Sequence, residues 1–224
     1  MFSQLEIGRI AGIPIHLDMM FVLVVMIFCY PYFTSGSTQL MSAGFIIVIG
    51  LLMSILLHEL GHAFAGRMFN APVSHIELTG LGGVAHFEHT LPSSTLVRTV
   101  VYLAGPAVNL LLWLGLDLLA GEAVGIGNPM LALPLAVLSY ANFLLMAFNL
   151  LPAYPLDGGH TLDAWLSAIL RYPWPTRIVA SLGLMVAVGL ILMALPNAFF
   201  LMLVALFIGI ANWQALQGVG RWRR

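Results

Sequence analysis

The sequence predicts a mainly α-helical, polytopic membrane protein with about six transmembrane helices. Short membrane-associated β-strands are expected near the N-terminus and between the second and third helices. Two observations carry this prediction. Of the 224 residues, 61% are hydrophobic and 8% are charged, whereas soluble domains carry about a quarter charged residues. The apolar residues also gather in windows of about 20 residues, the length that a helix needs to cross a bilayer.

Six windows meet this length criterion, and two intervening stretches have strand character. The windows cover residues 18–34, 42–66, 97–120, 130–151, 177–195 and 198–216. The opening LEIGRIAGIPIHLD has two strand-like runs around Ala11-Gly12, and VSHIELTGLGGVAHFEH, between the second and third windows, has two runs around a glycine-rich turn. Open sheet edges are not tolerated in lipid, so both hairpins are expected at or near the interface.

The arginines give an orientation. The chain has no lysine, and its basic residues are Arg9, Arg67, Arg98, Arg171, Arg177, Arg221, Arg223 and Arg224. Cytoplasmic loops near span ends collect positive charge. Six spans with a cytoplasmic N-terminus place every arginine on the cytoplasmic side, and the outer loops near 35–41, 121–129 and 196–197 hold none. We therefore expect one domain over residues 1–224, in the cell (inner) membrane, multi-pass, with both termini cytoplasmic.

Charge and cysteine content exclude other classes. The net charge of −1 leaves no basic patch, so nucleic acid is not an expected partner. The single cysteine, Cys29, excludes an intrachain disulfide. The lipid bilayer is the expected surrounding, and no pattern predicts an oligomeric state.

The run His58-Glu59-Leu60-Gly61-His62 fits H-E-x-x-H. On a helix, residues four apart share a face, so both imidazoles can reach one metal ion. Glu59 can lie near that ion without binding it and take a proton from the attacking water. The alternative is a chance string in a core helix. Ionisable residues are costly to keep in a membrane, which favours the metal site.

A catalytic zinc usually has three protein ligands and one open position. The best third ligand is Asp157 in NLLPAYPLDGGH, because the fourth window returns the chain to the side of the membrane where His58 and His62 lie. The Gly158-Gly159 pair permits unusual backbone angles beside it. The alternative role for Asp157 is the N-cap of a helix that starts near Thr161.

Three motifs, in this order, resemble the site-2 proteases, which are intramembrane zinc metalloproteases. They are HELGH in the second window, GPAVN (Gly105 to Asn109) in the third, and NLLPAYPLDGG (Asn149 to Gly159) at the end of the fourth. The resemblance covers a catalytic core of about 40–160, in the compact form without a PDZ or CBS domain.

The resemblance implies His58, His62 and Asp157 as ligands of one Zn²⁺ ion and Glu59 as the catalytic acid/base. It also implies hydrolysis of peptide bonds in or beside transmembrane helices of membrane-tethered substrate proteins, as in regulated intramembrane proteolysis. A transmembrane protein substrate is thus the expected partner.

Two asparagines have open roles. Asn149 is a candidate catalytic residue that could donate a hydrogen bond to the developing oxyanion, or it could make an interhelical hydrogen bond. For Asn109 we favour structural support of the metal-bearing helix, with a hydrogen bond to His58 or His62 as the functional alternative.

The stretch LGGVAHFE, residues 81–88, is a candidate for capturing an unwound substrate by edge addition. The other histidines are expected near interfaces, and surface exposure is the favoured state of His160. Residues three apart on a strand point to opposite faces, which argues against a metal shared by His86 and His89. The remaining histidines are His16 and His75.

Two other functions fit the same residues. A divalent-metal transporter would need polar groups in both halves of the membrane, but the outer half offers only scattered groups such as Asp117 and Glu122. An inactive relative that binds helices would not need the intact Glu59. The protease is therefore the favoured interpretation.

Overall fold

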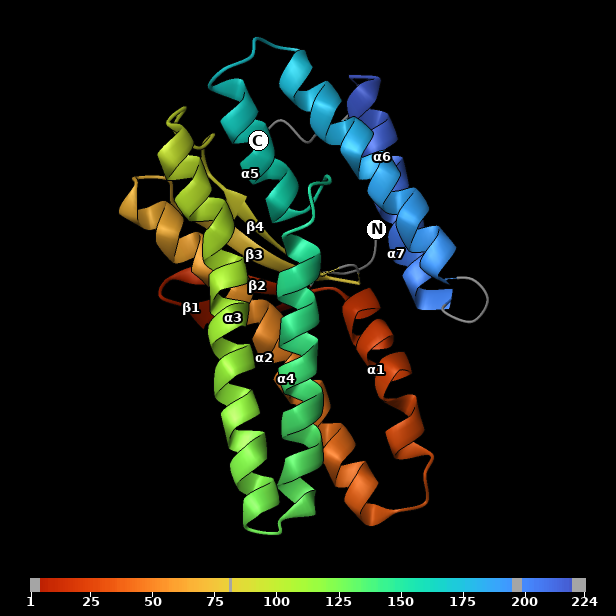
Figure 1. The fold of residues 1–224 in the computed structure, drawn as a ribbon. Helices are drawn as coiled ribbons and strands as arrows, with labels where there is room; N and C mark the ends of the chain where they lie inside the picture. Colours follow the sequence, from red (N-terminus) through yellow and green to blue (C-terminus); the bar gives the residue numbers. More distant parts are fainter. Residues whose placement is uncertain (1–4, 81, 195–198, 219–224) are drawn as a thin grey trace. The chain divides into compact units, whose positions relative to one another are not determined.

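The computed structural model describes residues 5–80, 82–194 and 199–218. Leu81, Arg221, Arg223 and Arg224 lie outside the described residues. The chain forms two compact units, one from residues 1–89 and 104–146, the other from residues 90–103 and 147–224. Figure 1 labels the elements: β1 (Leu5–Ile10), β2 (Ile13–Leu17), α1 (Met19–Phe33), α2 (Thr38–Met68), β3 (Val73–Thr79), β4 (Gly82–Phe87), α3 (Thr95–Gly125), α4 (Pro129–Asn149), α5 (Asp157–Ser167), α6 (Trp174–Ala194) and α7 (Phe199–Leu216).

Both strand-like stretches form antiparallel hairpins, as predicted. The β1–β2 loop consists of Ala11 and Gly12, whose φ angles are 50° and 82°. Positive φ at both central residues is the geometry of the two-residue turn that matches strand twist. Arg67, at the end of α2, donates from Nη2 to the carbonyl of Ala11 at 2.8 Å. This bond ties the first hairpin to the helix that carries the HELGH motif.

The two hairpins join into one four-stranded sheet, which the sequence did not predict. The strand order is β1-β2-β3-β4, and β2 pairs with β3 in parallel, with Ile15 opposite Ile76. One face of the sheet packs against α2. Its buried core includes Ile13, Ile15, Ile76 and Leu78 from the strands and Leu56, Leu60 and Ala63 from α2. Strand alternation leaves the polar side chains of β2 and β3 on the other face.

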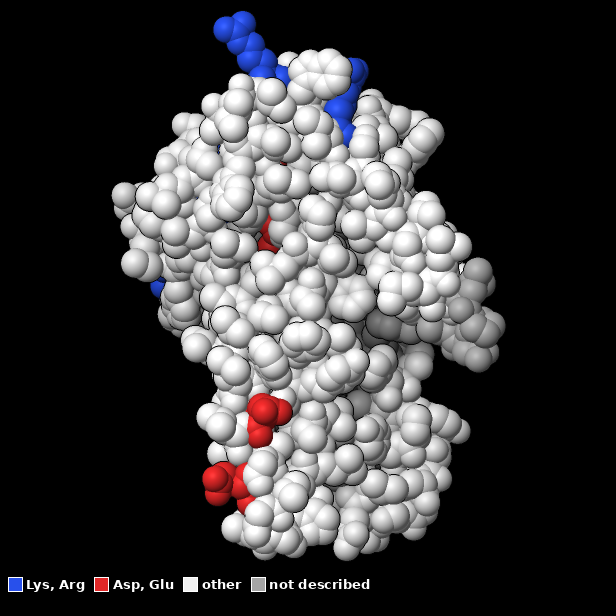
Figure 2. Space-filling model, viewed as in Figure 1, with Lys and Arg blue, Asp and Glu red and all other residues white. Residues whose placement is uncertain are grey.

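Every predicted window coincides with a helix. Within the described residues, α2, α3, α4 and α6 are long and apolar enough to cross a membrane. The first and sixth windows coincide with shorter apolar helices, Met19–Phe33 and Leu201–Leu216. The face drawn in Figure 2 carries few charged side chains, with uncharged surface between them. The prediction of a mainly helical membrane protein with a small sheet is confirmed, and the count of six spans stays a prediction.

The second unit contains a helix that lay outside the windows. This helix, α5, begins at Asp157, so the predicted start near Thr161 is wrong by one turn. In the same unit α6 and α7 run side by side (Figure 1). Tyr154, Val179, Ala180 and Ala215 form a buried cluster there.

Candidate metal centre

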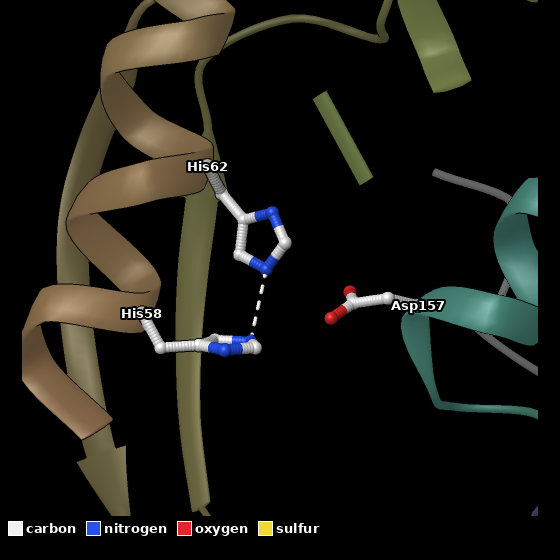
Figure 3. A group of neighbouring side chains, drawn as sticks. All are labelled: His58, His62 and Asp157. Atoms are coloured by element: carbon white, nitrogen blue, oxygen red, sulfur yellow. Dashed lines mark hydrogen bonds between the residues drawn. The ribbon is translucent and has the colours of Figure 1, made fainter. Parts of the chain in front are cut away.

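His58 and His62 project from the same side of α2, one turn apart (Figure 3). Their Nε2 atoms lie 3.1 Å apart, and both residues are only 6% exposed. Two nitrogens bound at about 2.1 Å to one tetrahedral zinc would lie about 3.4 Å from each other. The pair therefore has the separation that two ligands of one ion require.

The tautomer of the His58 imidazole is set by a buried amide. His58 Nδ1 donates to Oδ1 of Asn109, a residue of α3 that is 0% exposed. This bond leaves the Nε2 lone pair of His58 available to a metal. The hydrogen bond is the functional role that sequence analysis had ranked second for Asn109.

A chain of buried polar groups fixes the orientation of the Asn109 amide. Asn109 Nδ2 donates to Oδ1 of Asn142 at 2.8 Å, and Asn142 Nδ2 donates to Ser54 Oγ at 2.9 Å. Ser54 Oγ in turn donates to the carbonyl of Gly50 at 2.8 Å. Since each amide nitrogen finds an acceptor, Oδ1 of Asn109 is the atom that faces His58. Sequence analysis missed Asn142 and Ser54, although a fully buried asparagine in an apolar helix is an available signal.

The GPAVN motif begins with Gly105, a position at which a side chain would collide with the two imidazoles. A Cβ atom at this position would lie within 3 Å of Nε2 of both His58 and His62. In the reverse direction, a Cβ at Gly61 would meet the carbonyl oxygen of Ala104 at 2.9 Å. Two glycines thus allow α2 and this part of α3 to approach closely, and the space beside the two imidazoles remains open.

Glu59 is buried, at 5% exposure, and lies against the sheet. A Cβ at Gly83 of β4 would meet Glu59 Oε1 at 2.6 Å. The carboxyl group therefore lies beside the backbone of the strand segment proposed to capture substrate. A side chain at position 83 would displace the Glu59 carboxyl group from its place beside β4.

The predicted third ligand is Asp157, which is labelled in Figure 3. It is the first residue of α5 and belongs to the second unit. It follows the N-cap Leu156 and is not itself the cap, so the alternative capping role is wrong. A carboxylate in the first turn is stabilised by the partial positive charge of the helix N-terminus. Asn149, the last residue of α4, belongs to the same unit.

Gly158 and Gly159 serve close packing and not unusual backbone angles. Both lie within α5. A Cβ at Gly158 would meet the carbonyl oxygen of Leu151 at 2.6 Å, and a Cβ at Gly159 would meet that of Ala153 at 2.5 Å. The irregular segment before Asp157 therefore folds directly over the first turn of the helix.

A residue of α7, outside the three motifs that the sequence analysis singled out, holds this segment. The backbone N–H of Tyr154 donates to Oδ1 of Asn212 at 3.1 Å, and Asn212 Nδ2 donates to the carbonyl of Tyr154 at 2.7 Å. Asn212 is 0% exposed. A side chain at Gly183 of α6 would collide with it. The amide thus binds both backbone polar groups of one residue, Tyr154, three positions before Asp157.

Aromatic contacts surround His160, three residues after Asp157. Its ring centroid lies 5.1 Å from that of Tyr102 and 5.3 Å from that of Tyr154. The favoured expectation of a surface-exposed His160 is therefore wrong, because the residue is half-buried between two rings. Burial, followed by the Asp163 carboxylate, raises the pKa of the Tyr154 phenol, so its hydroxyl stays protonated at physiological pH.

Comparison with known proteins adds independent findings. Residues 46–124 and 123–195 match the model of peptidase family M50. A zinc metalloprotease of Methanocaldococcus jannaschii is 32% identical over 92% of this chain and 58% of the relative. A Synechocystis protein is 30% identical over 73% of this chain and 44% of the relative. The chain spans about half the length of these curated relatives.

A solved structure also matches nearly the whole fold. It is that of a site-2 protease from Methanocaldococcus jannaschii, with a TM-score of 0.67 and 28% sequence identity. The match covers 96% of this chain and 95% of the solved chain.

Proposed function

The chain belongs to peptidase family M50, and from this premise we propose that it is an intramembrane zinc endopeptidase. The resemblance to site-2 proteases is confirmed at the level of the family. We propose that its substrates are membrane-tethered proteins, cut in or beside a transmembrane helix. Family membership and the apolar helices make it a multi-pass membrane protein. The proposal includes location in the inner membrane, cytoplasmic termini and one functional domain that contains both units.

The proposed ligands of the one catalytic zinc ion are His58, His62 and Asp157. Two histidines and one carboxylate are a known donor set of catalytic zinc, with one position left open. The observation that carries the proposal is the imidazole pair, with Nε2 atoms 3.1 Å apart. The hydrogen bond from His58 to Asn109 and the absent side chain at Gly105 support it. When bound, zinc would polarise the scissile carbonyl group.

Glu59 is the proposed general base and general acid. It would take a proton from the attacking water and pass a proton to the leaving amine. Its burial and its contact with Gly83 of β4 hold the carboxyl group in one place. Asn149 is the proposed donor to the oxygen that becomes negatively charged in the transition state.

Strand β4 is the proposed binding edge for the unwound substrate. It ends the strand order of the sheet, so within the described residues no further strand pairs with its outer edge. A segment added there would form backbone hydrogen bonds along β4. Because Gly83 lies against Glu59, such a segment would pass close to the proposed base.

The test is cleavage of a tethered membrane substrate panel by the purified protein in liposomes. Glu59→Gln should retain zinc and lose cleavage by at least about 100-fold, the size expected for loss of a general base. Glu122→Gln changes an exposed glutamate of α3 and is the matched control, with wild-type cleavage expected. Cleavage by Glu59→Gln at the wild-type rate would contradict the proposal.

A further inference from the structure

Four metal-binding side chains share the face of the sheet that points away from α2. His16 lies on β2, His75 and Glu77 on β3, and His86 on β4. The register places His16 opposite Glu77 and His75 opposite His86. Strand alternation puts all four on the face opposite the buried Ile76 and Leu78.

Three of these residues are arranged closely enough to share an ion. One ligand atom from each of His75, Glu77 and His86 lies within 4.8 Å of the other two. His86 Nε2 and Glu77 Oε2 are 3.2 Å apart. The His75 and His86 rings are stacked at 4.3 Å, with 11° between their planes. All three are half-buried, so an ion could reach them.

His16 provides a fourth donor beside them. Its ring centroid lies 5.1 Å from that of His75. Its Nδ1 atom is buried, and within the described part of the chain it has no hydrogen-bond partner. A buried polar atom without a partner costs about 1–3 kcal/mol, so a ligand that bound this nitrogen would be stabilising.

We propose that this face holds a second metal ion, a divalent transition metal such as Zn²⁺, bound by His75, Glu77 and His86 with His16 as the fourth donor. Imidazole nitrogens suit zinc, copper and nickel, whereas magnesium and calcium take oxygen ligands. Sequence analysis compared His86 with His89 along one strand and found no shared site. The partner of His86 is instead His75, across the strand pair.

The position gives this ion a structural role. It would join β2, β3 and β4 at one point, and β2 and β3 belong to different hairpins. Three residues before His86, β4 carries Gly83, which lies against Glu59. An ion on the outer face would therefore stabilise the strand that positions the proposed base. This inference does not depend on hydrolytic activity.

The test counts zinc. The full-length protein in detergent is stripped with a chelator, dialysed against micromolar free Zn²⁺ and measured by mass spectrometry. Wild type should bind about two ions per chain. His75→Gln combined with His86→Gln should bind about one, and the matched control His89→Gln, an exposed histidine just beyond β4, should bind two.

A second variant separates this proposal from the proposed function. His58→Ala combined with His62→Ala should lose one ion and retain the one on the sheet. The ion that remains in the His75 and His86 variant also shows that this protein is folded. One ion in wild type that is retained in the His75 and His86 variant, or two ions in that variant, would overturn the second site.

Discussion

At the scale of single residues, the tautomer and orientation of the His58 imidazole are set by neighbours that are not themselves proposed metal ligands. Asn109 accepts from His58 Nδ1 and is itself oriented by Asn142 and Ser54. A buried network of this kind is stabilising only when every member is paired, and here each amide has both a donor and an acceptor contact. The network determines which nitrogen of His58 faces the metal position.

Replacing Asn109 should therefore weaken zinc binding. Asn109→Ala removes the acceptor that holds His58 in one tautomer, and loss of such a partner lowers metal affinity by about 10–100-fold. The measurement is a competition titration with a zinc chelator, on protein that also carries His75→Gln and His86→Gln, so that this centre alone is followed. Gln39→Ala changes an exposed amide at the start of α2 and should leave affinity unchanged. Equal zinc affinities in Asn109→Ala and Gln39→Ala would show that Asn109 contributes to helix packing and not to zinc binding.

Two glycines of α3, Gly105 and Gly115, allow the same substitution to be compared beside the imidazoles and away from them. Gly105→Ala would place a methyl group within 3 Å of both Nε2 atoms, and overpacking costs about 1–3 kcal/mol, or about 5–150-fold in zinc affinity. A Cβ at Gly115, also on α3, would meet nothing within 4 Å. Gly115→Ala should bind zinc normally and unfold no earlier than wild type. Normal zinc affinity in Gly105→Ala would show that the imidazoles do not use this space.

At the scale of elements, α7 anchors the segment that leads to Asp157. Asn212 binds the N–H and the carbonyl of Tyr154 with one side chain. An asparagine in the interior of an apolar helix is costly unless its hydrogen bonds are made. The amide is therefore part of the machinery that positions α5.

Asn212→Ala should destabilise the protein and disturb the metal centre together. It leaves two buried backbone groups unpaired, at about 1–3 kcal/mol each, so both the melting temperature and zinc occupancy should fall. Gln214→Ala, an exposed change two residues further along α7, is the control for loss of an amide. Thermal unfolding and zinc content are read on the same samples. A drop in stability with full zinc occupancy would limit Asn212 to a structural role.

Local sequence patterns predicted the helices and hairpins, but they did not predict which distant strands pair with each other. The Ala11-Gly12 turn and the apolar windows are visible within about 20 residues, so both hairpins and the long helices were predicted. The parallel pairing of Ile15 with Ile76 joins segments about 60 residues apart, and no periodicity encodes it. The contact of His75 with His86 was missed for the same reason, since it depends on cross-strand register.

A short motif names part of the proposed site, whereas helix packing supplies the residues around it. His58, Glu59 and His62 follow from one pentapeptide, and the structure places the three side chains as expected for a shared helix. Asn142, Ser54 and Asn212 belong to no short motif. Their role depends on which helices lie together, and that is decided by close contacts at residues such as Gly61 and Gly183.

At the scale of the whole molecule, the chain combines a bilayer-sized helical framework with a small sheet beside the proposed base. α2 serves both parts, because its apolar length can cross a membrane and its last turns carry HELGH against β3 and β4. Hydrolysis needs water, which the hydrocarbon core excludes. The proposed meeting place of substrate and helix is the outer edge of β4, where Gly83 lies against Glu59.

The central claim is that residues from two distant parts of the chain bind one zinc ion. X-ray absorption at the zinc edge, on protein carrying His75→Gln and His86→Gln, examines that centre alone. We expect two imidazole nitrogens and a carboxylate oxygen at about 2.0–2.2 Å. Adding Asp157→Asn should lower occupancy and change the spectrum, whereas adding Asp163→Asn, a change elsewhere on α5, should not. An unchanged spectrum and full occupancy with Asp157→Asn would contradict the proposed ligand set.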